Sequence, residues 1–242
     1  MKVLVVGGSS GVGLSLVLKL VGRDEVEGVY VLDKVLFPKD YNHDKISFAP
    51  CDLTQGDYSV LDGMKDVQAL YITAGFGHLK LFQELSETYI QDSFSVNAIA
   101  PIQVIRRYYD RLLSNEDFFC AVMVSIAGRL SSPLFSVYSA TKAALSKFIE
   151  AVNVELDVQG SRNRILEVSP GSLKGTGFTG GVSQPEQTAL LAGEIIARAQ
   201  RHEELYIPKY EEVFKNVIAR YEADAHQFGM ESYHYKKSKS RI

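Results

Sequence analysis

Tyr138 and Lys142 stand four positions apart in the segment Tyr-Ser-Ala-Thr-Lys. If this segment is helical, both side chains project from one face and can form an acid/base pair. A nearby ammonium stabilises a phenolate, so it lowers the pKa of a tyrosine from about 10 toward the working range. Proton transfer to or from an alcohol then becomes feasible. The segment alone is more often an ordinary polar helix face, so the assignment depends on the elements that must position the pair.

A glycine-rich turn follows the first apolar run of the chain. Residues 2–6 have the β-branched composition of a buried strand, and residues 11–21 carry apolar side chains at helical spacing. Between them, Gly7, Gly11 and Gly13 fit the pattern G-x-x-x-G-x-G, which lets backbone N–H groups and a helix N-terminus approach a pyrophosphate. The predicted cofactor loop comprises Gly7, Ser9, Ser10, Gly11, Val12 and Gly13.

Asp33 ends the next predicted strand and stands twenty positions after Gly13. A carboxylate there accepts hydrogen bonds from both hydroxyls of an adenosine ribose, which strengthens the prediction of a dinucleotide site. The same charge repels the 2′-phosphate of NADP, and the glycine turn contains no Arg or Lys to attract that phosphate. We therefore predict NAD as the cofactor, although the adjacent Lys34 leaves NADP open.

Asp52 and Leu53 follow a short predicted strand, residues 46–49. The carboxylate of Asp52 stands where it can meet the adenine amino group. It can equally cap a helix over residues 54–64, and both roles can hold at once.

Thr73, Ala74 and Gly75 turn the chain after the next buried strand, residues 67–73. The carboxyl edge of an open α/β sheet is where such folds bind ligands. Small side chains at this turn allow a cofactor ribose to lie close to the backbone.

Asn97 is a polar residue on the apolar face of a long predicted helix, residues 87–113, which Pro101 should kink. Its amide is either a satisfied core group or a site that holds a water. Ser125 ends another apolar run and stands thirteen positions before Tyr138. Both residues therefore belong to elements that can reach the tyrosine.

Taken together, these motifs resemble the short-chain dehydrogenase/reductase family. The resemblance covers residues 1 to about 210. It is carried, in the family's order and approximate spacing, by Gly7-x-x-x-Gly11-x-Gly13, Asp33, Asp52, Ala74-Gly75, Asn97, Ser125, Tyr138-x-x-x-Lys142 and Pro170-Gly171. It implies an α/β fold with a doubly wound, mainly parallel sheet of the Rossmann type, a single domain, and NAD(P) across the carboxyl edge of that sheet.

The resemblance also implies a role for each member of a catalytic tetrad, Asn97, Ser125, Tyr138 and Lys142. Ser125 would polarise the substrate oxygen, and Tyr138 would donate or remove the proton. Lys142 would lower the pKa of Tyr138 and bind the nicotinamide ribose. Asn97 would hold a water that links the lysine to solvent.

Two departures from the family pattern affect the cofactor end. Thr73 replaces an asparagine that usually contributes to the adenine side of the site. Pro170 and Gly171 are expected near the nicotinamide carboxamide, but Gly175 stands where the family often has a threonine. We therefore assign the carboxamide and diphosphate contact to the next residue, Thr176.

Composition limits the class of protein. The chain has 242 residues, 46% hydrophobic and 23% charged, with a net charge of −3. This balance gives no indication of a nucleic-acid partner. Cys51 and Cys120 are too few for a disulfide scaffold and favour a reducing compartment. The apolar runs are interrupted by Gly7 and Lys19 before they could span a bilayer, so we expect a cytoplasmic protein with no membrane partner and no bound metal.

The substrate walls are expected on the segment after Ser125 and on the segment after Gly171. The predicted contacts, Ile126, Leu130, Phe135 and Phe178, favour a partly apolar alcohol or ketone. Arg129 either pairs with a substrate anion or faces solvent. The glycine-rich segment 174–183 has the composition of a mobile loop that can close over substrate, or of a plain flexible loop.

Helix-capping residues and the distribution of charge predict the elements in the last part of the chain. Ser183 and Glu186 are expected to form a capping box for a helix ending near Gln200, so residues 172–200 would form the substrate loop and helix. A last strand at 204–207 and a helix at 210–227 should follow. Residues 229–242 are basic and are expected to form a poorly ordered, solvated tail.

These observations predict an NAD(H)-dependent oxidoreductase that acts on a small-molecule alcohol or carbonyl compound. The alternative is a non-catalytic dinucleotide-binding protein that keeps the fold as a regulator or scaffold. By resemblance, the helices at 87–113 and 136–158 would form the interfaces of a homodimer or homotetramer.

Overall fold

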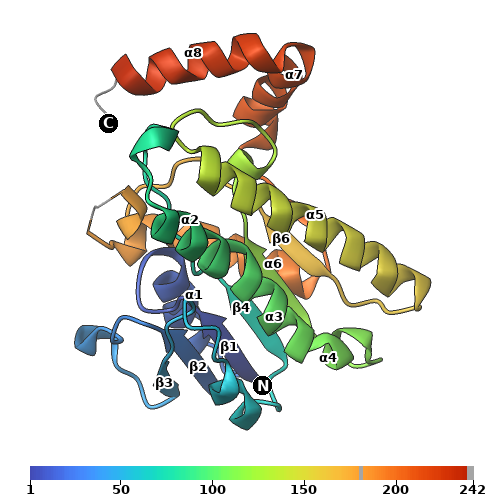
Figure 1. The fold of residues 1–242 in the computed structure, drawn as a ribbon. Helices are drawn as coiled ribbons and strands as arrows, with labels where there is room; N and C mark the ends of the chain where they lie inside the picture. Colours follow the sequence, from blue (N-terminus) through green and yellow to red (C-terminus); the bar gives the residue numbers. More distant parts are fainter. Residues whose placement is uncertain (180–181, 239–242) are drawn as a thin grey trace.

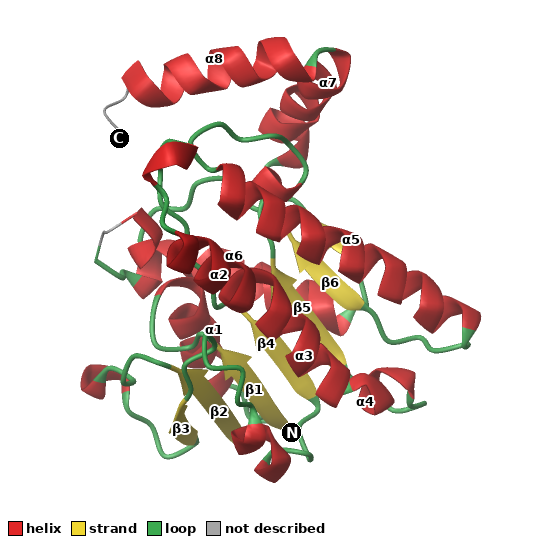
Figure 2. Ribbon diagram, viewed as in Figure 1, coloured by secondary structure: helices red, strands yellow, loops and turns green. Residues whose placement is uncertain are grey.

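Within residues 1–179 and 182–238, the part of the chain that the computed structural model describes, seven parallel strands form one sheet in the order β3-β2-β1-β4-β5-β6-β7 (Figures 1 and 2). The strands are β1 (Lys2–Val6), β2 (Gly28–Asp33), β3 (Ile46–Pro50), β4 (Ala69–Ile72), β5 (Phe119–Met123), β6 (Ile165–Val168) and β7 (Leu205–Tyr206). The order reverses between β1 and β4, which is the switch point where Rossmann-type sheets bind ligands. The predicted fold class is confirmed.

Alternate strand residues enter two separate cores, which explains why the strands read as continuous apolar runs. On β1, Val3 and Val5 enter one core, and Leu4 and Val6 enter the other. All four side chains are almost completely buried. Any register slip would therefore exchange side chains between two filled layers.

Helices cover both faces of this sheet. The helix α1 (Gly11–Val21) packs with α6 (Pro185–Gln200) on one face, while α3 (Ala100–Arg107) and α5 (Ser136–Val158) cover the other (Figure 2). Two short helices, α2 (Glu87–Phe94) and α4 (Tyr109–Leu113), flank α3. The two layers fix α1 and α5 over the carboxyl edge of the sheet, where the predicted motifs lie.

The single helix expected over residues 87–113 is instead three helices joined end to end. A π turn, Ser95–Ile99, joins α2 to α3, and Tyr108 separates α3 from α4. Pro101 lies in the first turn of α3, where a missing N–H does no harm. The irregularity therefore comes from the π turn, and this turn contains Asn97.

The connections after β2 and β3 lack full helices. They contain only the 3-10 turns Lys39–Tyr41 and Ser59–Gly63. The helix expected over residues 54–64 is wrong, because the chain turns at Asp52 and Thr54 instead of continuing. The adenine end of the sheet is consequently thinly covered.

The C-terminal region differs most from expectation. After β7, a π turn (Tyr210–Phe214) leads into α7 (Lys215–Ala223), and α8 (Ala225–Ser238) folds back from it across the molecule (Figure 1). The predicted tail at 229–242 is thus helical as far as Ser238, and residues 239–242 lie outside the described part. None of the helices in the described residues is both long and apolar enough to cross a membrane.

Candidate active site

Tyr138 and Lys142 occupy the first turns of α5 and are both buried, with 8% and 2% of their surface exposed. Neighbouring segments approach this helix closely because they carry glycine. A Cβ on Gly77 would stand 2.8 Å from the Tyr138 ring, and one on Gly128 would stand 2.8 Å from the Lys142 backbone. The expected pair is therefore packed in the interior and not on a polar helix face.

The ionisation of this pair differs from expectation. Burial raises the pKa of Tyr138 to about 12, and its hydrogen bond with Ser125 acts in the opposite direction. Burial lowers the pKa of Lys142 to about 7. The Lys142 Nζ lies 5.9 Å from the Tyr138 ring centroid and donates to the Met123 carbonyl at 2.9 Å. The predicted lowering of the Tyr138 pKa by Lys142 is thus not found, because desolvation dominates both groups.

Ser125 lies at the end of β5 and precedes the 3-10 turn Ile126–Gly128. Its Oγ accepts a hydrogen bond from Ala127 N at 3.1 Å, and its side chain also reaches Tyr138. The backbone on either side is bound to the end of β6, through Val124 N to Val168 O (2.8 Å) and Ile126 N to Pro170 O (3.0 Å). The serine is therefore held between the tyrosine and the expected nicotinamide turn.

Asn97 is fully buried in the π turn, and its amide is satisfied. The Oδ1 atom accepts from Phe76 N at 3.0 Å, while Nδ2 donates to Phe76 O at 2.9 Å and to Thr141 Oγ1 at 3.3 Å. Of the two alternatives, the side chain itself is the satisfied core amide. It fixes the turn after β4 against α5, close to Tyr138.

The glycine loop is built by backbone contacts. Gly7 has φ of +86°, and a Cβ there would stand 2.5 Å from Ala74 N. A Cβ on Gly13 would stand 2.0 Å from Gly7 O. Thr73 does not extend toward the adenine side, because its hydroxyl donates to Gly7 O at 3.0 Å or to Val6 O at 3.2 Å. It therefore ties the end of β4 to the loop.

Asp33 ends β2 with its carboxylate held by two backbone donors. Ser9 N donates to Oδ2 and Val35 N donates to Oδ1, each at 3.0 Å. Each oxygen retains acceptor capacity for a hydroxyl. Within the same loop, Ser10 caps α1 without a side-chain hydrogen bond, and Val12 is buried in the core.

Asp52 and Leu53 have local structural roles. The Asp52 Oδ1 accepts from Thr54 N at 3.0 Å and from Thr54 Oγ1 at 2.8 Å, which lowers the pKa of the carboxyl group. Leu53 is buried in the core beneath it. Asp52 therefore closes a turn at the edge of the sheet and remains exposed to solvent.

The predicted capping box on α6 is wrong. The cap residue is Gln184, which makes no side-chain cap bond, and Ser183 Oγ instead accepts a hydrogen bond from Gly11 N at 2.7 Å. Thr176, from the same connecting segment, lies against Gly11, where an added Cβ would come within 3.5 Å of it. The segment after Pro170 and Gly171 therefore returns to the start of α1.

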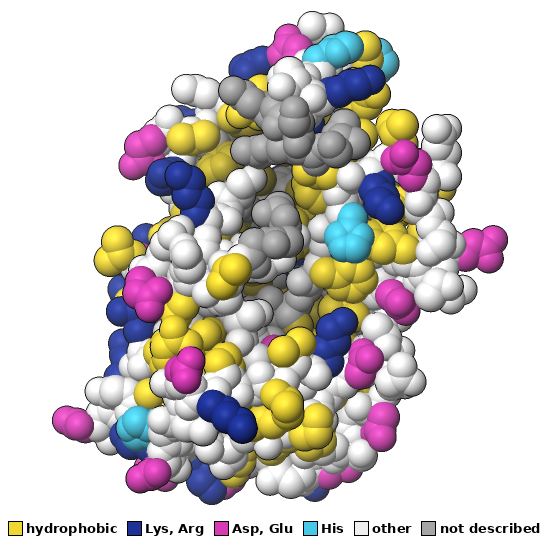
Figure 3. Space-filling view, turned by 90° about the vertical axis from the view of Figure 1, so that its left-hand side faces the viewer, with side chains coloured by type: hydrophobic (Ala, Val, Ile, Leu, Met, Phe, Trp, Pro, Cys, Tyr) yellow, Lys and Arg dark blue, Asp and Glu magenta, His cyan; other side chains and the backbone are white. Residues whose placement is uncertain are grey.

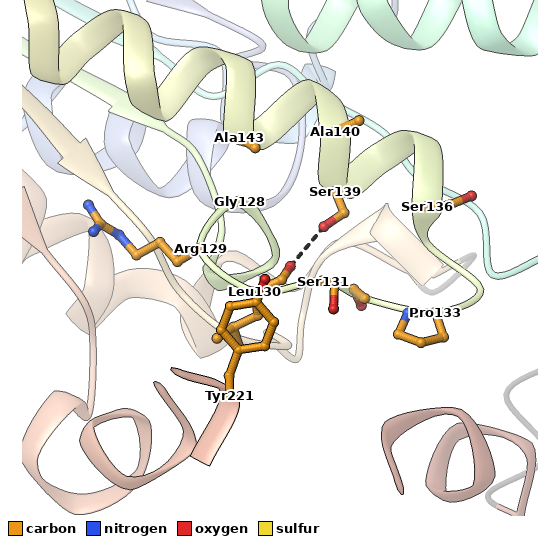
Figure 4. A pocket seen from close by; sticks show the side chains of 11 residues that line it. Gly128, Arg129, Leu130, Ser131, Pro133, Ser136, Ser139, Ala140, Ala143 and Tyr221 are labelled. Carbon is orange, nitrogen blue, oxygen red and sulfur yellow. Dashed lines mark hydrogen bonds between the residues drawn. The ribbon is translucent and has the colours of Figure 1, made fainter. Parts of the chain in front are cut away.

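Two of the four predicted substrate contacts surround the tyrosine. The ring centroids of Phe135 and Phe178 lie 5.4 and 5.1 Å from that of Tyr138, and 6.1 Å from each other. Ile126 is half-buried in the turn that follows Ser125. Leu130 instead lines a cavity of about 500 Å³ together with Tyr221 (Figure 4). The Leu130 carbonyl accepts a hydrogen bond from Ser139 Oγ at 2.9 Å.

Glu167 is a buried carboxylate that the sequence pattern did not single out, although an acidic residue within an apolar strand was a visible signal. Its Oε1 accepts from Arg129 Nε (3.1 Å), Arg129 Nη2 (2.8 Å) and Ser169 Oγ (2.7 Å), and its Oε2 accepts from Ser146 Oγ (2.8 Å). Arg129 is therefore paired within the protein, while about a third of its side chain remains exposed. The arginine joins the Ser125 turn to β6.

One face of the molecule is hollowed, and hydrophobic side chains flank the hollow (Figure 3). The sequence pattern of the family described as "short chain dehydrogenase" matches residues 1–187. The chain belongs to the short-chain dehydrogenase family. Hydride transfer with a nicotinamide cofactor is the general activity of this family.

Curated relatives of this short-chain dehydrogenase are distant. The uncharacterised oxidoreductase YDL114W of Saccharomyces cerevisiae is 25% identical over 210 residues, which covers 80% of this chain and 65% of the relative. The oxidoreductase YbbO of Escherichia coli K12 is 26% identical over 195 residues, which covers 76% and 70%. The chain spans slightly less than two thirds of the length of the yeast protein.

Solved structures agree in fold. A short-chain dehydrogenase from Streptomyces avermitilis has a TM-score of 0.77 at 21% identity, covering 97% of this chain and all of that one. An alcohol dehydrogenase from Thermococcus sibiricus, complexed with 5-hydroxy-NADP, has a TM-score of 0.69 at 19% identity, covering 86% and 95%. At these identities the likeness shows the fold alone.

Proposed function

We propose that this protein is an NAD(H)-dependent alcohol dehydrogenase or carbonyl reductase in which Tyr138 is the general acid/base. One observation carries the proposal: the buried Tyr138 hydroxyl meets Ser125 beside an aromatic wall, with Lys142 one helical turn away. A phenol that is protonated at neutral pH can donate to the oxygen of a carbonyl group. Ser125 supplies a second hydrogen bond to the same oxygen.

Lys142 serves proton transfer in this proposal. Because burial lowers its pKa to about 7, the amine exchanges its proton near neutral pH and can restore the one that Tyr138 gives up. Asn97 positions the path by holding the turn at Phe76 against α5. In the direction of alcohol oxidation the same groups accept the proton.

The residues present fit a nicotinamide dinucleotide. The glycine loop leaves no room for a Cβ at Gly7 or Gly13, and it leads directly into the N-terminus of α1, which is the kind of helix end that binds a diphosphate. A Cβ on Gly75 would stand within 3.3 Å of both Asn97 Oδ1 and Lys142 Nζ, so a bare backbone is needed there too. When bound, the cofactor supplies or accepts the hydride.

Other residues are assigned to parts of the cofactor on the same grounds. Asp33 would accept from the adenosine ribose, which favours NAD over NADP. Asp52, Leu53 and Ala74 would border the adenine side, while Thr73 would hold the glycine loop in place. Lys142 would bind the nicotinamide ribose. The diphosphate loop would be Gly7, Ser9, Ser10, Gly11, Val12 and Gly13, and the carboxamide turn would be Pro170, Gly171 and Thr176.

The substrate is proposed to be a small molecule with an apolar body next to its alcohol or carbonyl carbon. Phe135 and Phe178 present ring faces and edges beside Tyr138, with Ile126 nearby in the Ser125 turn. These side chains offer dispersion and no charge. Arg129 does not contribute a charge to the substrate in this proposal, because Glu167 holds it.

The decisive experiment compares Tyr138→Phe with the parent protein in NADH oxidation across a panel of ketones and aldehydes. Loss of a positioned acid should lower kcat by at least about 10²-fold, while the affinity for NADH stays the same. Tyr109→Phe is the matched control, because that hydroxyl only accepts from Gln159 on the outside of the fold. Equal turnover by Tyr138→Phe would overturn the acid/base role of Tyr138, whereas a parent protein inert toward the whole panel would favour the non-catalytic alternative.

A homodimer or homotetramer through α5 is also proposed. Val154 and Val158 expose 60% and 83% of their surface on this helix, which is consistent with a face that a second copy covers. Sedimentation equilibrium tests this directly. A mass equal to the 26.8 kDa of one chain would overturn it.

A further inference from the structure

The C-terminal helices contact both walls of the proposed substrate site. At one end, Phe214 lies against Gly171, where an added Cβ would stand 2.5 Å from the phenyl Cζ. At the other end, α8 lies over the segment that precedes α5 (Figure 1). There, Gly229 faces Pro133, since a Cβ on this glycine would come within 3.8 Å of the proline Cγ. Helix α8 therefore lies where it can act on Phe135.

Lys236 makes the polar contacts of α8 with this segment. Its Nζ donates to Ser132 Oγ at 2.6 Å and to Pro133 O at 2.8 Å, and it lies 5.6 Å from the centroid of the Phe135 ring. The ammonium thus holds two consecutive residues and lies near the ring of a third. Charge-assisted hydrogen bonds of this kind are stronger than neutral ones.

The segment that Lys236 holds contains a strained residue and borders a cavity. Leu134 has φ of +69°, a left-handed conformation that is unfavourable for a non-glycine residue. A cavity of about 500 Å³ lined in part by Ser131, Ser132 and Tyr221 adjoins this segment (Figure 4), whereas the Leu134 side chain is buried. On the other side Lys80 N donates to Leu134 O at 2.9 Å. The turn is consequently held between two polar anchors.

The α7–α8 hairpin can hold Lys236 in place because its two helices contact each other. Tyr221 and Phe228 meet edge to face at 5.8 Å, and Arg220 pairs with Glu231 across the two helices. Asp224 Oδ1 accepts from Gln227 N at 2.8 Å, which caps the first turn of α8. A hairpin with these contacts presents Lys236 at a defined place.

We propose that Lys236 is a positioning residue that sets substrate specificity by fixing the 132–135 turn and hence the Phe135 ring beside Tyr138. The substrate part of this inference rests on the proposed function. The family pattern ends at residue 187, so α8 lies outside the part that it matches. Specificity would then come from a C-terminal helix that acts on a wall of the site without touching the reacting atoms.

The test uses the full chain with Lys236→Met, which keeps the length of the side chain and removes the ammonium. Two backbone amides report on the turn directly: Lys80 N, bonded to Leu134 O, and Phe135 N, bonded to Ser132 O at 2.9 Å. Hydrogen exchange at both should accelerate by about tenfold. Lys236→Arg, which keeps the charge, should restore slow exchange.

Kinetics supply the second measurement. KM should rise by about five- to tenfold for ketones with bulky apolar groups and less for small ones, with kcat within about twofold and an unchanged Kd for NADH, because ground-state fit is lost and chemistry is not. Lys237→Met is the matched control: this exposed neighbour lies over the Tyr233 ring on α8 itself, and its loss should change neither measurement.

The outcomes separate this inference from the proposed function. Unchanged exchange at Lys80 and Phe135 overturns the positioning role, whether or not the parent protein reduces any ketone. Faster exchange with an unchanged KM profile in an active enzyme overturns the specificity role. If the parent protein is inert toward every carbonyl compound, the proposed function fails, and the exchange measurement still decides whether Lys236 fixes the turn.

Discussion

The proposed cofactor end and the proposed substrate end of the site are built by different means. At the cofactor end, a Cβ on Gly7 would meet the backbone of Ala74, and a Cβ on Gly13 would meet the backbone of Gly7. Backbone segments that follow neighbouring strands of one sheet therefore define the shape of this end. At the substrate end, Phe135, Phe178 and Lys236 come from three segments far apart in the chain and meet through side chains. A site shaped by backbone demands particular residue types, whereas a site shaped by side chains depends on where helices dock.

Gly13→Ala should produce the largest effect if this contrast holds. An added Cβ would stand 2.0 Å from Gly7 O and 2.5 Å from Thr73 Oγ1, and a backbone carbonyl of the neighbouring turn cannot yield cheaply. We expect NADH to bind at least about 10²-fold more weakly, or about 2.7 kcal/mol, measured by quenching of NADH fluorescence or by calorimetry.

Gly177→Ala is the control from the substrate end. Among the residues that the structure describes, none has an atom within 4 Å of a Cβ at this glycine, so NADH affinity should stay within about twofold of the parent value. Similar losses of affinity in the two variants would break the contrast between the two ends. A loss confined to Gly13→Ala would sharpen it.

The parts of the fold that could be predicted are those that local chemistry dictates. The strand, turn and helix around Gly7 and Gly13 are recognisable because only glycine satisfies the positive φ at Gly7 and the close approach at Gly13. Asp33 follows from its place at the end of β2. The parallel sheet follows from continuous apolar strands that must be covered on both faces.

The parts that could not be predicted depend on tertiary contacts. Ser183 looked like a helix cap, but α6 packs beside α1 and thereby brings its hydroxyl to Gly11 N. Glu167 is tolerated inside β6 only because Arg129 and two serines happen to converge on it. The basic residue Lys236 suggested a solvated tail, and only the fold of the hairpin shows that it binds Pro133. Most of these contacts join residues that are far apart in the sequence, so local residue spacing does not predict them.

Asp33→Ala tests the electrostatic part of the cofactor end and should have a smaller effect. Removing the carboxylate removes repulsion of a 2′-phosphate and also two acceptors for ribose hydroxyls. We expect the NADPH to NADH ratio of kcat/KM to rise by about tenfold, or about 1.4 kcal/mol. Asp52→Ala should leave this ratio unchanged, because any adenine contact is common to both cofactors. An unchanged ratio in Asp33→Ala would contradict the assignment of NAD.

Lys142 lies where the two ends meet, and the pH dependence of stability tests its burial. Its pKa falls from 10.5 to about 7 in the folded protein, so between these values the unfolded chain binds more protons and stability rises with pH. Below about pH 7 the folded protein bears the full cost of a buried ammonium. Lys142→Met has no such group, so its Tm should exceed that of the parent most at about pH 6 and least at about pH 10, with each kcal/mol worth about 2–4 °C.

Lys147→Met provides the comparison for this last measurement, because Lys147 is exposed on the same helix and pairs with Glu150 at 2.6 Å. Its Tm difference from the parent should not follow the same trend. If the difference for Lys142→Met is constant from about pH 6 to about pH 10, the lysine is hydrated in solution and keeps an ordinary pKa. The proton path assigned to it would then lose its basis, while the glycine loop and Asp33 would be unaffected.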